Sequence, residues 1–270
     1  MSFWDHLEEF RWTLIRIIGA VLIFTIAGLI VIPKIFDSVI LAPSSSDFVT
    51  YRFLDKASQY ITFLPDFSAE AFKVDMLNIN MTTQFMTYIS TSLAFAVLCT
   101  IPFILFQLWR FVSPALYENE AKGVKTAFGF GGFMFVIGCL VGYFIVFPLI
   151  FRFLITFELS DKIRNSISLD SYMNNFYTLI LIMGLVFELP LVFWLLSNLG
   201  LVYRPFFRKF RKHAIVGSLV LAAIITPSGD PFSLFVVTLP LYMLWEISAF
   251  VVKKEPPELE EEDNLPAIFE

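Results

Sequence analysis

The sequence is poor in the residues that metal binding and catalysis use most. Its 270 residues include only two cysteines and two histidines. Cys99 and Cys139 stand alone in apolar runs, and His6 is far along the chain from His213, so none of them has metal-ligand spacing. The sequence also lacks a Gly-x-x-x-x-Gly-Lys-[Ser/Thr] phosphate loop and a Gly-x-Ser-x-Gly nucleophile motif. We therefore expect no enzyme activity, no cofactor and no metal site.

Charged residues are also scarce, at 16% of the chain, and the net charge of −5 comes mainly from the C-terminal tail. No basic patch indicates a nucleic-acid partner. Hydrophobic residues instead make up 57% of the chain, 33 residues are phenylalanine, and the mean hydropathy is +0.75. A water-soluble fold could not bury this much apolar surface, so lipid must solvate much of the chain. The sequence predicts an all-α integral membrane protein, with the lipid bilayer as a partner.

Hydropathy and helix-breaking residues predict six transmembrane helices within a membrane domain over residues 1–252. Residues 34–82 and 152–171 are the predicted external segments, the first of them a partly helical cap. Residues 253–270 form an acidic cytoplasmic tail that we expect to be disordered. The predicted spans cover residues 14–32, 84–111, 126–151, 172–199, 213–226 and 232–252. The fifth span reaches only about 21 Å, which is less than the roughly 30 Å hydrocarbon core.

The positions of lysine and arginine predict the orientation in the membrane. An even number of spans puts both termini on one side. Most of the 19 basic residues lie on that side, in the N-terminal segment, residues 112–125, residues 200–212 and Lys253–Lys254, with the adjoining span ends. Cytoplasmic loops of membrane proteins carry an excess of such residues. We therefore expect both termini to be cytoplasmic.

Two strings at the cytoplasmic side are unusual in their composition. Residues 1–12 repeat apolar side chains at spacings of three and four, which predicts an amphipathic helix on the membrane surface, and they contain His6-Leu-Glu-Glu-Phe-Arg11. The turn between the second and third spans contains Gln107-Leu-Trp-Arg-Phe-Val-Ser-Pro-Ala-Leu-Tyr-Glu-Asn-Glu120. Its aromatic residues lie where membrane–water interface belts lie. Each string thus places acidic and aromatic residues at the membrane surface.

Both strings resemble motifs of the TatC family, the polytopic core subunits of the twin-arginine protein translocase. The first is similar to the family's His-Leu-x-Glu-Leu-Arg, which aligns with Glu9 and Arg11. The second is similar to the family's aromatic helix end, its Pro-Ala-Leu and the glutamate that follows, which falls on Glu120. The chain departs from the family at Thr13, where a second arginine often stands, and at Ala121, where a basic residue often stands.

The resemblance implies a receptor that binds the twin-arginine signal peptides of folded cargo proteins. Arginine pairs with a carboxylate through two charge-assisted hydrogen bonds, so carboxylates on two separate elements suit two adjacent guanidinium groups. The resemblance also implies recruitment of single-span subunits of the TatA/TatB type, assembly as a homo-oligomer within a larger complex, and export driven by the proton gradient across the bacterial inner membrane. The implied signal-peptide site comprises Glu9, Arg11, Phe111, Pro114, Leu116, Tyr117 and Glu120. Structural or partner-proximal roles are implied for Pro43, Pro148, Pro190 and Asp230.

Glu188 is an acid in the middle of the fourth predicted span. A charge at that depth costs roughly 2.5–3.5 kcal/mol on insertion scales, so such residues usually mark a pathway or a partner contact. The resemblance implies that Glu188 contacts a polar residue of a single-span partner. Two alternatives stay open: a proton-coupled small-molecule transporter with Glu188 as its relay, and a structural membrane scaffold. A transporter would normally show an internal repeat and several polar residues at mid-depth, and this chain shows neither.

Overall fold

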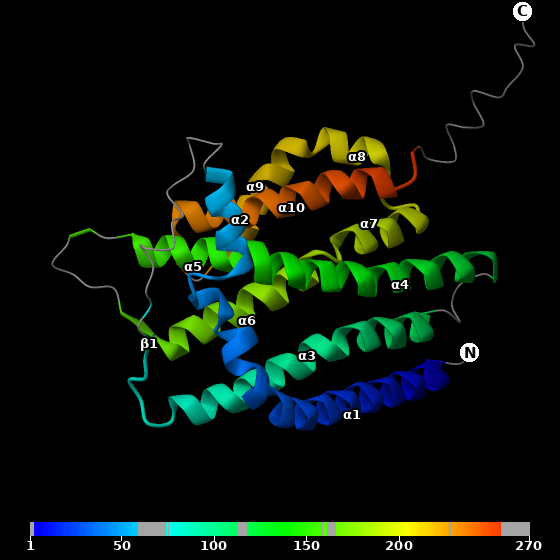
Figure 1. Ribbon diagram of the computed structural model, residues 1–270. Coiled ribbons are helices and arrows are strands. Elements are labelled where there is room, and N and C mark those ends of the chain that lie inside the picture. The colour runs from blue at the N-terminus through cyan, green and yellow to red at the C-terminus, as the bar shows by residue number, and fades with distance from the viewer. Residues whose placement is uncertain are drawn as a thin grey trace, which may run out of the picture. The chain divides into compact units, whose positions relative to one another are not determined.

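The computed structural model describes residues 3–58, 74, 76–112, 118–157, 159–160, 166–226 and 228–254. It confirms the all-α class, because almost every described segment is helical (Figure 1). The chain divides into two compact units, Met1–Gly184 and Leu185–Glu270, and each is described by itself. The predicted tail from residue 255 onward lies outside the described residues.

The first unit is built on an antiparallel pair of long apolar helices, α1 (Phe3–Ile35) and α3 (Thr83–Val112). The helices approach closely at Gly28, where a Cβ atom would lie 2.9 Å from the backbone oxygen of Ser92. One turn away, the Tyr88 hydroxyl donates to the Leu29 carbonyl at 2.5 Å. Glycine permits this approach because it has no side chain to separate the two backbones.

The first unit also contains α4 (Glu118–Val141), α5 (Phe147–Thr156) and α6 (Leu169–Val186). A five-residue π-helical segment, η5 (Gly142–Val146), joins α4 to α5, and α4 also packs against α3. A two-residue parallel ladder pairs β1 (Met76–Leu77) with β2 (Ile167–Ser168).

Helix α1 is longer than the first predicted span. It runs unbroken from Phe3, so the surface helix predicted for residues 1–12 and the span predicted for residues 14–32 form one helix. Glycine and proline are both absent from residues 3–18, and nothing else there ends a helix. The apolar period of the first turns simply continues into the span.

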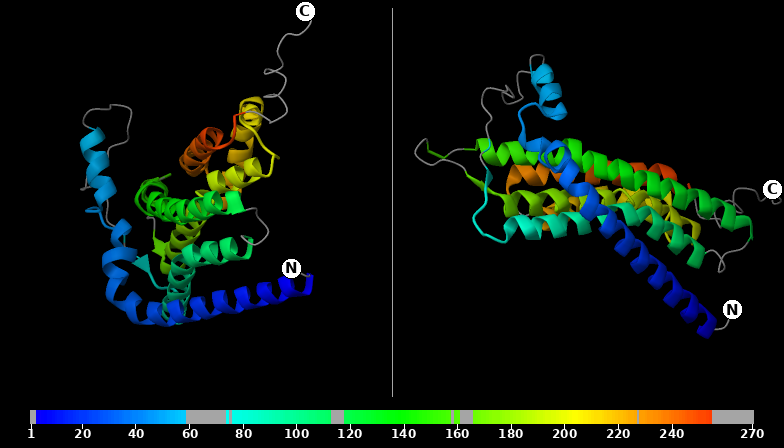
Figure 2. Two further views of the ribbon diagram at one scale, coloured as in Figure 1. Left: turned by 90° about the vertical axis from the view of Figure 1, so that its right-hand side faces the viewer. Right: turned by 60° about the horizontal axis from the view of Figure 1, so that its bottom comes forward.

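A cap segment follows α1 and turns sharply away from its axis (Figure 2). It consists of η1 (Phe36–Ile40), η2 (Ala42–Ser44) and α2 (Val49–Ser58). The buried Tyr51 hydroxyl fastens it, donating to the carbonyls of Pro43 at 2.9 Å and Pro148 at 3.2 Å. The two prolines that the sequence singled out therefore meet at one tyrosine.

The second unit contains α7 (Leu189–Asn198), α8 (Arg204–Lys209), α9 (Arg211–Ile225) and α10 (Pro231–Val251). Helix α10 packs against α7, α8 and α9. Phe193, Phe207 and Trp245 form its aromatic core, with ring centroids 4.7–5.5 Å apart. Among the described residues five stretches are long and apolar enough to cross a membrane, and α9 is not among them. Its 15 residues reach about 22 Å, as expected for a short fifth span.

Asp230 caps the N-terminus of α10. Its carboxylate accepts a hydrogen bond of 2.8 Å from the backbone N–H of Ser233 and one of 2.6 Å from the Ser228 hydroxyl. Burial alone would raise the pKa of this carboxyl, but the hydrogen bonds from Ser228 and Ser233 outweigh it and hold the pKa below its ordinary value.

We expect Asp230→Ala to lower the free energy of unfolding by about 0.5–2 kcal/mol, the usual cost of losing a side-chain cap. Asp230→Asn should retain most of the stability that the cap provides, because its amide oxygen still accepts a hydrogen bond from the Ser233 N–H. A depressed native pKa adds stability above the unfolded pKa that is lost as the pH falls through the native one. The difference in stability between the parent and Asp230→Asn should therefore begin to narrow below the unfolded pKa of about 4 and disappear only below the native pKa. Thermal unfolding in detergent at several pH values measures this, and equal stability of parent and Asp230→Ala at pH 7 would contradict the capping role.

Candidate functional site

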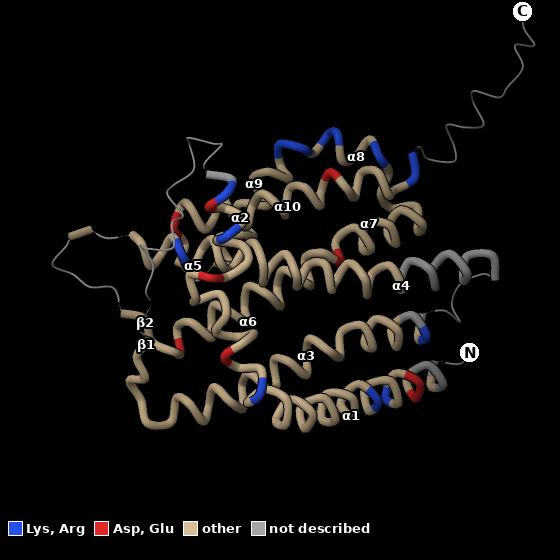
Figure 3. Tube along the Cα trace, in the orientation of Figure 1, with Lys and Arg blue, Asp and Glu red and all other residues tan. Residues whose placement is uncertain are grey.

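In the long helices α1 and α3 of the first unit, the described charged residues lie toward the helix ends (Figure 3). Arg11 near the start of α1 and Arg110 near the end of α3 lie at the same end of the antiparallel pair, and both are exposed. This end also carries both of the strings that the sequence singled out. This end of the α1–α3 pair is therefore the candidate binding site for a charged or polar ligand.

Two aromatic rings join α1 and α3 at this end. The rings of Phe10 on α1 and Phe111 on α3 lie with their centroids 5.7 Å apart. Beside Phe10, the Glu9 side chain is half-buried, and its Oε2 atom is buried with no hydrogen-bond partner among the described residues. An unpaired buried polar group costs about 1–3 kcal/mol, and more when it is charged. This carboxylate is therefore placed to accept a donor that the described part of the chain does not supply.

Gln107 belongs to the same place, and the sequence-based site did not include it. Its side chain is only 4% exposed, and its Oε1 atom has no partner among the described residues. It lies one helical turn before Phe111 on α3, on the same face. The sequence signal was a single amide within an apolar run, which alone does not distinguish a buried side chain from one that faces the membrane surface. We call Glu9, Phe10, Gln107 and Phe111 the end cluster.

The structure describes some of the other residues predicted to bind the signal peptide and not others. Glu118 and Glu120 lie in the first turn of α4 rather than in a turn between helices, and their side chains are outside the described part. Acidic residues are favourable in a first turn because the helix dipole is positive there. Pro114, Leu116 and Tyr117 lie outside the described residues. The structure thus joins Glu9 and Phe111 in the end cluster and leaves Arg11 exposed beside it.

Glu188 lies in the second unit, at a break in the fourth predicted span. Helix α6 ends at Val186, Glu188 is the N-cap residue of α7, and Pro190 follows in the first turn. The Glu188 side chain is 8% exposed, and neither of its carboxylate oxygens has a hydrogen-bond partner among the described residues. Thr238 on α10 has a buried hydroxyl that is unpartnered in the same sense. The buried indole nitrogen of Trp245 is a third, so three side chains of this unit have polar atoms without a partner among the described residues.

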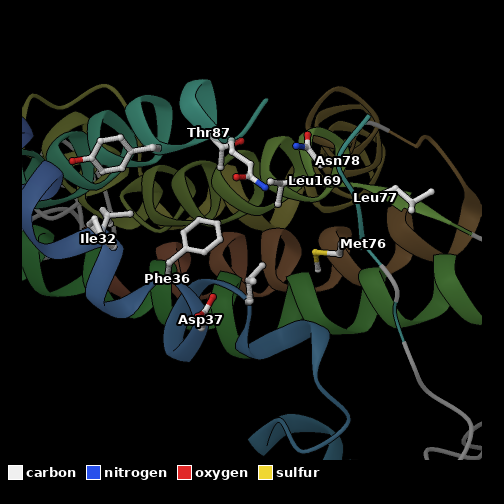
Figure 4. A pocket seen from close by; sticks show the side chains of 12 residues that line it. Ile32, Phe36, Asp37, Met76, Leu77, Asn78, Thr87 and Leu169 are labelled. Atoms are coloured by element: carbon white, nitrogen blue, oxygen red, sulfur yellow. The ribbon is translucent and has the colours of Figure 1, made fainter. Parts of the chain in front are cut away.

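A cavity of about 490 Å³ lies at the other end of the α1–α3 pair (Figure 4). Asp37 and Phe36 of η1 border it, together with Asn78, Thr87 and Leu169. None of the residues predicted to bind a signal peptide lines it. Among the described residues no group of three or more His, Cys, Asp or Glu side chains could hold a metal ion.

Comparison with known proteins shows the family. Residues 5–240 match the family described as "Sec-independent protein translocase protein (TatC)". The Sec-independent protein translocase protein TatC of Blattabacterium sp. subsp. Periplaneta americana is 34% identical over 252 residues, which cover 93% of this chain and 94% of that protein. The TatCy protein of Bacillus subtilis is 29% identical over 253 residues, covering 94% and 89%.

Solved structures agree with the sequence comparison. Two crystal structures of the twin-arginine translocase receptor TatC superimpose with TM-scores of 0.69 and 0.72, each at 29% identity. They cover 91% and 92% of this chain and 97% and 99% of their own. The described helices, the two family strings and these matches lead to one conclusion: the chain belongs to the TatC family and is a transmembrane component of the Sec-independent, twin-arginine protein translocase.

Proposed function

We propose that this protein is the signal-peptide receptor and core subunit of its translocase. It binds twin-arginine signal peptides of folded cargo at the cytoplasmic side of the bacterial inner membrane and recruits single-span subunits for export driven by the proton gradient. It works as a homo-oligomer within a larger complex.

The observation that carries this proposal is the buried Oε2 atom of the half-buried Glu9 side chain, which has no hydrogen-bond partner among the described residues. A guanidinium is the donor best suited to it, because arginine stays charged and presents five N–H groups in a planar fork. Glu120, in the first turn of α4, supplies the second carboxylate for the neighbouring arginine. Arg11, Phe111, Pro114, Leu116 and Tyr117 frame the polar part of the peptide.

The first unit has an apolar cavity of about 420 Å³, which we propose binds the apolar stretch of the signal peptide. Side chains of α1, α3, α4 and α6 line it, including Ile35, Phe95, Leu98, Phe135 and Ile180. Its lining is almost wholly apolar, which suits a hydrophobic segment arriving through the lipid.

The direct test reconstitutes the purified full chain in lipid nanodiscs and presents a folded cargo carrying an arginine-pair signal peptide. We expect the cargo to bind, and a matched cargo whose two arginines are replaced by lysines to bind much more weakly. Equal retention of the two cargoes would remove arginine recognition from the account.

Topology gives an independent prediction. Both termini, residues 112–125 and residues 200–212 lie on the cytoplasmic side in this proposal. Single cysteines at Ser45 and Ser166 should therefore react with a membrane-impermeant reagent added to intact cells, while cysteines at Asn119 and Arg208 should react only after the cells are broken. Labelling of the Asn119→Cys variant in intact cells would reverse the orientation.

A further inference from the structure

We propose that Gln107 binds the signal peptide directly, and that its carboxamide oxygen and the Glu9 carboxylate accept hydrogen bonds from the same guanidinium group. This inference rests on the proposed function and deepens it, because it assigns one arginine of the pair to the seam between α1 and α3. The other arginine is then left to Glu120.

The register of the two helices brings Gln107 and Glu9 to one seam. The contacts of Phe10 with Phe111 and of Gly28 with Ser92 fix an antiparallel alignment over most of the length of α1. In that alignment Gln107 is level with Thr13, which is 5% exposed. Glu9 lies one turn from Thr13 on the same face of α1. The two unpartnered oxygens therefore face a common space between the helices.

The described part of the chain has no internal donor for these two oxygens. The guanidinium groups of Arg11 and Arg110, although close in sequence, belong to exposed side chains. A seam in which two buried acceptor atoms have no hydrogen-bond partner among the described residues is complementary to a cation that brings several N–H groups. In this proposal the donor comes from the signal peptide.

The geometry selects arginine over lysine. A guanidinium is planar and can donate in two directions at once, so it can bridge acceptors on two different helices. A lysine ammonium is a compact and strongly hydrated point charge, so it loses more hydration on entering the seam and lacks the planar fork of donors. Gln107 is thereby a specificity-determining residue as well as a binding residue.

The seam can open at its outer end. The first turns of α1 are thinly covered, since Trp4, Leu7 and Phe10 are 76%, 44% and 44% exposed. A small displacement of these turns away from α3 admits a side chain between Phe10 and Phe111. The bound arginine then supplies N–H donors to the two oxygens that have no partner among the described residues.

The test measures binding of fluorescent signal peptides to the full chain in nanodiscs. Gln107→Met keeps the side-chain volume and removes the acceptor, whereas Gln107→Glu keeps an acceptor in the same place. Gln84→Met, at the opposite end of α3, is the matched control. Three peptides are compared: one with the arginine pair, one with the first arginine replaced by lysine, and one with the second replaced.

We expect Gln107→Met to weaken binding of the arginine-pair peptide by roughly ten- to hundredfold, the usual effect of losing a hydrogen bond to a charged group. The loss should shrink to about threefold or less with one of the two lysine peptides, and with the same one for which Glu9→Ala loses its effect. Gln107→Glu should bind the arginine-pair peptide nearly as well as the parent, and Gln84→Met should match the parent.

Two results would overturn the inference. Unchanged binding by Gln107→Met shows that no contact exists, and an equal loss with all three peptides shows that Gln107 only supports the fold. If Glu9→Ala and Glu120→Ala weaken binding while Gln107→Met does not, this inference alone fails. If none of the three variants weakens binding, the proposed function fails with it.

Discussion

Replacing Glu120 with alanine should weaken binding of a twin-arginine signal peptide by roughly ten- to hundredfold and reduce export of twin-arginine cargo accordingly. In the proposed site, the variant removes the carboxylate that pairs with one guanidinium of the arginine pair. Glu9→Ala should weaken peptide binding less than Glu120→Ala does, because Gln107 still offers an acceptor in the same seam. Peptide affinity in nanodiscs and cargo export in cells measure the two effects.

Each change has a matched control in the chain. Glu118 lies two residues before Glu120 in the same turn of α4, and Glu8 is an exposed neighbour of Glu9. Glu118→Ala and Glu8→Ala should bind the peptide like the parent, and all four variants should accumulate to normal levels. Crosslinking of the signal peptide to Glu120→Ala at the parental level would show that the carboxylate site is assigned wrongly.

The second large effect concerns Glu188 and the single-span partner subunits. Glu188→Ala should leave folding and signal-peptide binding near normal, because neither carboxylate oxygen makes a hydrogen bond within the described chain. Crosslinking to the partner helix should fall by roughly three- to twentyfold, the range that polar contacts between membrane helices support. Glu188→Gln should retain much of the contact, because an amide still donates and accepts.

The two substitutions distinguish the partner contact from the transporter alternative. If Glu188→Gln fails as completely as Glu188→Ala, a titrating carboxyl is required, which favours a proton relay. If neither variant changes partner crosslinking or export, Glu188 has a structural role at the break between α6 and α7. Thr238→Val is a useful companion, because it removes another buried polar group of the second unit that has no partner among the described residues.

Much of the fold could be predicted from the apolar runs of the sequence and from the residues that break helices. The predicted spans lie almost wholly within helices, because long apolar runs satisfy their backbone groups in lipid only as helices. The break at Phe187–Glu188 has its cause in the sequence: Pro190 lacks an N–H, and its ring clashes with the carbonyl four residues earlier, at Val186, where α6 ends. The sequence had placed Glu188 within a helix, and the structure makes it a cap residue instead.

Other features depend on contacts that no local pattern contains. The Tyr51 hydroxyl reaches the Pro148 carbonyl across 97 residues, so the fastening of the cap segment could not be predicted from periodicity. Gln107 is the corresponding case at the site. Its burial results from the helix that packs over it, and only the register of α1 against α3 reveals it. Glu9 and Glu120, by contrast, could be proposed as site residues from the sequence because each lies in a string that resembles a family motif.

We propose that the arginine pair of a signal peptide binds at the end of α1, α3 and α4 where Glu9 and Glu120 lie. The most direct measurement places a photo-crosslinking residue beside the arginine pair of a signal peptide, binds the peptide to the full chain in nanodiscs, and maps the crosslinks by mass spectrometry. We expect crosslinks within residues 4–13 and 103–122, abolished by a peptide with two lysines. Crosslinks confined to the cap segment, or unchanged by the lysine replacement, would contradict the account.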